Sequence, residues 1–182
     1  RDQVSEYLKN LGQNERKILR ELGVKFGRYH VFLHQLIKPE AVSLRTLLWK
    51  NFHQKFYNLK PPTFGLNFVD NKDLKNQNFM LLCGFEKFDA FFVRIDILER
   101  LFMLIINSNS KEKSDIKVVP EMLNLLGCSK ENFKKLLTKM NYKVFEKKKE
   151  LYFKYDPNKK FKKVPIKKIS KENPFEILKN LN

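Results

Sequence analysis

The sequence predicts an α+β fold that is mainly helical and carries short β-hairpins. Two observations predict this class. Apolar residues recur at helical spacing over several segments, and β-rich runs follow them, each after a glycine or asparagine able to end a helix. The 182 residues, 42% of them hydrophobic, are sufficient to bury a core.

The amino-terminal segment predicts two helices and a hairpin. Helical spacing covers residues 5–11 and 14–22, and Gly23 is placed to end the second helix. Residues 24–33 form two β-rich halves around Gly27, which is typical of a short hairpin or a kinked strand.

A third helix is expected over 40–55, because Pro39 suits the first turn of a helix, where its missing donor is not needed. We expect the apolar face of this helix to pack on a core through Ala41, Leu44, Leu47, Leu48 and Phe52. The prolines within 60–65 exclude regular structure and predict a loop or a joint between subdomains.

The middle of the chain begins a second set of elements. Residues 76–83 predict a short helix that Gly84 ends, and 88–95 are strand-like. Asp96 is placed to cap a strongly apolar helix over 97–106.

Two further helices and a hairpin are expected after a polar linker. The helices cover 119–127 and 129–140, and two β-rich runs, 142–145 and 151–155, flank a polar tip. Two helices followed by a hairpin with a charged turn are winged-helix-like.

The junction between helix and hairpin recurs at Gly23, Gly84 and Asn141, about 60 residues apart, and predicts one unit used three times. The expected divisions are a helix-plus-hairpin subdomain over 1–60, a second helix-plus-hairpin subdomain over 61–156, and a flexible basic tail over 157–182.

The charge of the chain points to a polyanionic partner. Lysine and arginine number 37 against 20 acidic residues, a net charge of +17, which favours nucleic acid, with acidic lipid as the competitor. The longest apolar stretch is far too short to cross a bilayer, and the amino terminus lacks a signal-peptide layout. We therefore expect a cytoplasmic protein without a membrane partner.

Local motifs give no reason to expect a catalytic centre, a cofactor or a metal site. No phosphate-binding loop, dinucleotide-binding loop, zinc-protease pair or nucleophile elbow occurs in the sequence. His30 and His34 would share a face only on a helix, and their segment is strand-like. Asp96 and Glu99 could form an acid pair, but helix capping and surface ion pairing explain them more simply. The two distant cysteines are expected to be free thiols.

Basic residues at two hairpins are candidates for nucleic-acid binding. At the last hairpin, Lys147, Lys148 and Lys149 could form a wing that reaches a phosphate backbone. The alternative is a solvated turn. The first hairpin offers a second patch of Lys25, Arg28 and Tyr29, in which a guanidinium or a ring could stack on an unpaired base. The alternative for the ring is packing in the core.

The tail carries the densest charge, because residues 141–182 hold 13 lysines against 5 acidic residues. Its Lys159, Lys160, Lys162 and Lys163 could bind along a polyanion without fixed geometry. The alternative is a tail that only aids solubility. An apolar motif near its end could dock on another protein through Phe175, Ile177 and Leu178.

Several segments resemble the carboxy-terminal region of alphaproteobacterial DExH-box helicases, which are similar to the mitochondrial degradosome-type RNA helicases. They are LGVKFGR at 22–28, LIKPEA at 36–41, LLW at 47–49, VRIDILERL at 93–101, PEMLNLLGC at 120–128 and NPF at 173–175. The Lys-rich tail departs from the Ala- and Arg-rich tails of that family.

The resemblance implies that this chain is a fragment and that the helicase motor domains precede Arg1 in the parent protein, an ATP-dependent hydrolase. It assigns the chain an accessory, non-catalytic role in gripping or guiding RNA or DNA, with single-stranded RNA favoured. The alternative is a module that docks a helicase or ribonuclease partner, with the positive charge only aiding solubility.

Removing the residues after Asp156 is expected to weaken nucleic-acid binding by a similar factor for all sequences. Each lost phosphate contact lowers the salt slope of binding by about one, so titrations at several salt concentrations measure the effect. The shortened chain should still fold. Unchanged affinity and slope would assign the tail to solubility or protein docking.

Overall fold

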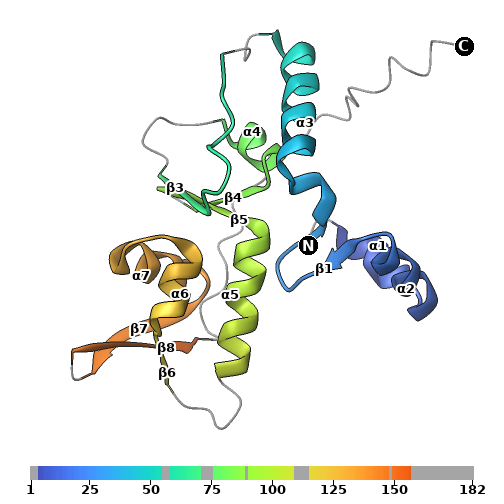
Figure 1. Ribbon diagram of the computed structural model, residues 1–182. Coiled ribbons are helices and arrows are strands. Elements are labelled where there is room, and N and C mark those ends of the chain that lie inside the picture. Colours follow the sequence, from blue (N-terminus) through green and yellow to red (C-terminus); the bar gives the residue numbers. More distant parts are fainter. Residues whose placement is uncertain are drawn as a thin grey trace, which may run out of the picture.

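The computed structural model describes residues 4–54, 58–70, 76–88, 90–108, 115–147 and 149–156. It has the predicted α+β class, with helices and small antiparallel sheets (Figure 1). The predicted basic tail and its apolar motif lie outside the described residues.

The first unit consists of two helices and a hairpin. Helices α1 (Ser5–Asn10) and α2 (Gln13–Glu21) lead through Gly23, at a φ of +92°, into strands β1 (Val24–Phe26) and β2 (Val31–Leu33). The two strands pair antiparallel, as the predicted hairpin requires.

The second unit adds a strand to the same pattern. Its strand β3 is the outer neighbour of β5 in an antiparallel sheet of order β3-β5-β4. Asn76 caps α4, because its side chain accepts the backbone N–H of Phe79 at 3.1 Å. The elements are a 3-10 helix η2 (His34–Ile37), α3 (Pro39–Phe52), β3 (Phe68–Asp70), α4 (Gln77–Leu82), β4 (Phe85–Phe88) and β5 (Phe91–Arg94).

The third unit has the element order of a winged helix. A helix, a strand, two helices and a hairpin follow one another, and the sheet has the order β6-β8-β7. Ser129 caps α7, as predicted, by accepting the N–H of Asn132 at 3.2 Å. The elements are α5 (Ile95–Ser108), β6 (Ile116–Lys117), α6 (Pro120–Leu126), α7 (Lys130–Lys139), β7 (Tyr142–Lys147) and β8 (Glu150–Tyr155).

The structure confirms the predicted threefold junction between helix and hairpin. Gly23, Gly84 and Asn141 have φ values of +92°, +85° and +67°, and each stands between a helix and the first strand of an antiparallel hairpin. The left-handed conformation suits glycine best and asparagine next. Three similar local signals therefore produce three similar local structures.

Strand β5 joins two hydrophobic clusters. Successive side chains of a strand point to opposite faces. Phe91 and Val93 accordingly belong to the main cluster around α5, α6 and α7, whereas Phe92 belongs to a second cluster with Phe79 and Phe85. The second cluster also contains Val42, which precedes the predicted joint at residues 60–65, so residues from both sides of that joint pack together.

Helix α3 packs through a different face from the one predicted. Leu44, Leu47 and Leu48 are exposed to 57%, 53% and 41%, whereas Val42 and Thr46 are buried. The buried face is fixed by Trp49, whose ring lies 5.4 Å from that of Phe79. The Thr46 hydroxyl donates to the Ser43 carbonyl at 3.0 Å, which makes its burial possible.

The carboxylate of Glu99 on α5 holds the loop of the first hairpin. It accepts the backbone N–H groups of Arg28, Tyr29 and His30 at 2.6, 2.8 and 2.8 Å. A Cβ atom on Gly27 would lie closer to this carboxylate than the 3.0 Å that real Cβ atoms keep. Gly27 is thus required for space, and α5 carries the first hairpin opposite α6 and α7 (Figure 1).

Replacement of Gly27 by Ala is expected to destabilise the fold by about 1–3 kcal/mol, since the added methyl displaces a carboxylate that accepts three N–H groups. Denaturant unfolding measures the change. The double-mutant cycle with Glu99→Ala supplies the control, because Gly27→Ala should cost little once the carboxylate is gone. Equal costs in both backgrounds would refute the assignment.

Candidate nucleic-acid interface

Helix α7 exposes a row of lysines that the sequence interpretation missed. Phe133, Leu136 and Leu137 are buried against the main cluster, so the opposite face points outward. That face carries Lys130, Lys134, Lys135 and Lys139, all exposed. The signal was present in the sequence, because these lysines recur at helical spacing opposite the apolar residues. In a winged helix this is the position of the recognition helix.

The hairpin β7–β8 presents two of the predicted lysines, and Lys148 lies outside the described residues. Strand β7 extends through Lys147, which therefore ends a strand instead of lying in the turn. Lys147 pairs with Asp115, and its ammonium lies 5.1 Å from the ring centroid of Phe145. Lys149 is exposed in the turn at a φ of +64°. Lys149 is the more available of the two for a phosphate.

The outer face of the third sheet combines rings and charge. Phe145 and Tyr152 are cross-strand partners with centroids 6.3 Å apart and nearly parallel planes. Lys143 and Lys154 are directly opposite each other and both exposed. Like charges in such positions repel, so a bound anion would be favourable here.

Ion pairs neutralise other lysines of the third unit. Lys117 pairs with Glu150 at 2.5 Å, and Lys134 pairs with Glu146 at 3.1 Å. All four side chains are largely exposed, so these pairs are worth little stability. Their effect is to fix where lysine ammonium groups lie on the surface.

The first hairpin presents its predicted residues in different environments. Lys25 and Arg28 are exposed, and the Arg28 guanidinium lies 6.0 Å from the ring centroid of Phe102 on α5. Tyr29 is half-buried, packs on the main cluster and meets Phe102 edge to face at 5.3 Å. Burial raises the pKa of its hydroxyl. Arg28 and Lys25 are therefore accessible, while the Tyr29 ring contacts α5.

The structure does not bring the two predicted patches together. Tyr29 is a hydrogen-bond partner of Tyr142, at the start of β7, whereas Lys147 and Lys149 lie at the other end of the hairpin. Six-residue strands span roughly 17 Å between their ends. The first hairpin, which belongs to the first unit, and the wing of the third unit thus form separate surfaces.

His30 bridges two carboxylates. Its Nδ1 lies 3.2 Å from Glu99 and its Nε2 lies 3.2 Å from Glu86. Burial alone would lower the pKa of His30, but hydrogen bonds and charges from Glu86 and Glu99 raise it overall. Burial alone would raise the pKa of Glu99, but hydrogen bonds from His30 and the hairpin N–H groups lower it overall. Both shifts favour a charged pair.

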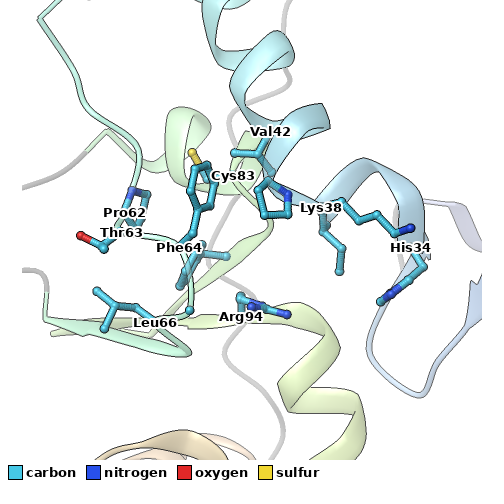
Figure 2. A pocket seen from close by; sticks show the side chains of 13 residues that line it. His34, Lys38, Val42, Pro62, Thr63, Phe64, Leu66, Cys83 and Arg94 are labelled. Atoms are coloured by element: carbon cyan, nitrogen blue, oxygen red, sulfur yellow. The ribbon is translucent and has the colours of Figure 1, made fainter.

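A cavity of about 150 Å³ lies between the loop before β3 and the start of α3 (Figure 2). Figure 2 shows Pro62 and Phe64 on one side and His34 and Lys38 on the other. Arg94 also lines it, but its guanidinium binds Asp96 through contacts of 2.8 and 2.5 Å. The cavity is small and the Arg94 guanidinium that lines it is already paired, so it offers little to a ligand.

The described residues contain no cluster of three His, Cys, Asp or Glu side chains suited to a metal ion. Asp96 and Glu99 act as structural groups, since Asp96 binds Arg94 and the Ile97 N–H. None of the helices in the described part of the chain is long and apolar enough to cross a bilayer.

Comparison with known proteins found no matching family model, no matching curated protein and no matching solved structure. The assignment of a function therefore depends on the surfaces described above and on the residues that form them.

The His30 bridge predicts a stability that depends on pH. The pKa of His30 is higher in the folded chain than in the unfolded chain, where it is about 6.5, so protonation of His30 stabilises the fold. This stabilisation is complete below pH 6.5 and is lost as the pH rises through the pKa of His30 in the folded chain. Replacing Glu86 by Gln removes part of that stabilisation. The difference in melting temperature between wild type and Glu86→Gln should be largest below pH 6.5 and shrink above it.

The matched control for this titration is Glu121→Gln, on the exposed side of α6. It should shift the melting temperature by the same small amount at each pH. A constant difference for Glu86→Gln across the range would contradict the bridge as a pH-dependent contact.

Proposed function

We propose that this chain is a non-catalytic nucleic-acid-binding module. The observation that carries the proposal is the third unit, whose winged-helix order places exposed lysines on both α7 and the β7–β8 hairpin. Lysine ammonium groups bind phosphates as point charges, and such contacts supply most of the affinity for nucleic acid without reading sequence. The net charge of +17 adds attraction at long range.

The biological setting of the proposal comes from the resemblance of the sequence. On that basis the module is the accessory region of a cytoplasmic ATP-dependent helicase, and it grips or guides single-stranded RNA for motor domains in the same parent chain. RNA and DNA share the phosphate chemistry that the lysines recognise. Binding measured with both distinguishes them.

A protein-interaction module is the second candidate, and helix α3 favours it. Its leucines at 44, 47 and 48 are all exposed, as is Leu36 of the neighbouring η2, whose carbonyl accepts a hydrogen bond from Arg45 at 3.1 Å. An apolar patch of this kind is typical of a surface that another protein covers. A helicase motor or a ribonuclease would be the partner in this reading.

Replacing Lys149 by Asn is expected to weaken binding of single strands and duplexes by a similar factor and to lower the salt slope by about one. Asparagine tolerates the left-handed conformation found at this position, so the hairpin turn is kept. Fluorescence anisotropy titrations at several salt concentrations measure both quantities.

The control is Lys9→Asn, which removes the same charge from the exposed end of α1. It should leave the salt slope nearly unchanged. If the wild-type chain binds nucleic acid and both substitutions have equally small effects on binding, the interface does not include the hairpin turn. Absence of any binding at low salt would instead favour the protein-interaction reading.

A further inference from the structure

The tips of the first two hairpins lie against the rest of the chain. The first is held by Glu99, as described above. The second, between β4 and β5, borders helix α7 and encloses a groove of about 510 Å³ with it. This volume lies within the range of about 300–1,000 Å³ found for small-molecule sites.

One wall of the groove is apolar and flat. It is formed by Phe88, Ala90 and Phe91 at the tip of the β4–β5 hairpin. The rings of Phe88 and Phe91 are stacked, with centroids 5.8 Å apart and planes 19° from parallel. Phe91 is buried and packs on Phe68 at 4.7 Å, so the half-buried Phe88 rests on a fixed support. A flat apolar group of a ligand finds a rigid partner here.

The opposite wall is cationic. It consists of the exposed side of α7, with Lys134, Lys135 and Lys139 beside Thr138 and Glu131. Lys134 is drawn towards β7 by its ion pair with Glu146. Lys135 is exposed and lines the groove, so its ammonium is placed to meet negative charge there.

The position of the β4–β5 tip limits what α7 can contact. A recognition helix reads a B-form duplex by entering a major groove about 12 Å wide with its exposed face. Here Lys134, Lys135 and Lys139 of that face line a groove whose other wall belongs to the same chain. A duplex cannot surround the helix in this arrangement, whereas a single strand can lie between the walls.

We infer that this groove binds a single strand of nucleic acid, with a base against Phe88 and Ala90 and an adjoining phosphate against Lys135. The apolar wall matches a base, and the cationic wall matches the backbone, as in other surfaces that bind single strands through stacking and charge. The inference rests on the proposed function and deepens it, because it names the place where the single strand is bound.

The test uses the full chain with labelled oligouridylate, the corresponding oligodeoxythymidylate, and a blunt duplex of the same length. Ala90→Glu places a carboxylate in the groove at an exposed turn position, where stability should change little. Its control is Asn124→Glu, which adds the same charge on the exposed side of α6, outside the groove.

Ala90→Glu is expected to lower the affinity for the single strand about tenfold, the effect of one lost stacking contact, and Asn124→Glu to lower it far less. A second pair lies on α7. Lys135→Ala, inside the groove, should reduce the salt slope by about one, and Lys130→Ala, on the same helix but outside the groove, should reduce it less. Thermal melts of all four variants confirm that folding is intact.

The outcomes separate the groove from the proposed function. Equal weakening of wild-type binding by Ala90→Glu and Asn124→Glu would overturn the assignment of a single strand to the groove. A duplex that binds more tightly than the single strand, and whose binding Ala90→Glu abolishes, would also overturn it. Either result leaves nucleic-acid binding by the chain standing. A wild-type chain that binds none of the three probes at low salt would refute the proposed function itself. Photo-crosslinks from a thiouridine-containing strand should map to Phe88, Ala90 or Phe91, and crosslinks confined to β7–β8 would also overturn the groove.

Discussion

The arrangement of the units depends on one carboxylate. Glu99 accepts three successive backbone N–H groups of the first hairpin loop and contacts the His30 ring. Backbone N–H groups of a loop need partners when they are half-buried, and here the partner comes from a helix about 70 residues away in sequence. Charge-assisted bonds of this kind are stronger than neutral ones. They fix the first hairpin on α5, and α5 in turn carries the third unit.

Local signals explain which parts of the fold could be predicted. Gly23, Gly84 and Asn141 each mark a helix end by their tolerance of positive φ, and the hairpins follow from β-rich runs after them. The capping role of Ser129 was also visible, because it depends only on residues within one turn. The short strands β3 and β6, of three and two residues, carry too little pattern to be recognised alone.

The errors came from contacts between distant residues. Helix α3 has two apolar sides, and the choice between them was made by Trp49 meeting Phe79 from another helix, which no local pattern reports. Within the candidate interface, the lysines of the wing were found from composition, whereas those of α7 needed the buried side of the helix to be identified first. The sequence predicts Glu99 on a helix surface, whereas its partners are the hairpin N–H groups and the His30 ring, about 70 residues away, and no local pattern reports them.

Strand β5 has a consequence for cooperativity. Because Phe91 and Val93 complete one cluster and Phe92 completes the other, neither cluster is closed without the same four-residue strand. Opening of β5 exposes both hydrophobic clusters to water at once, so the two clusters cannot unfold independently, as two separate cores could. The sequence repeats therefore divide the architecture, whereas the two hydrophobic clusters are stable only together.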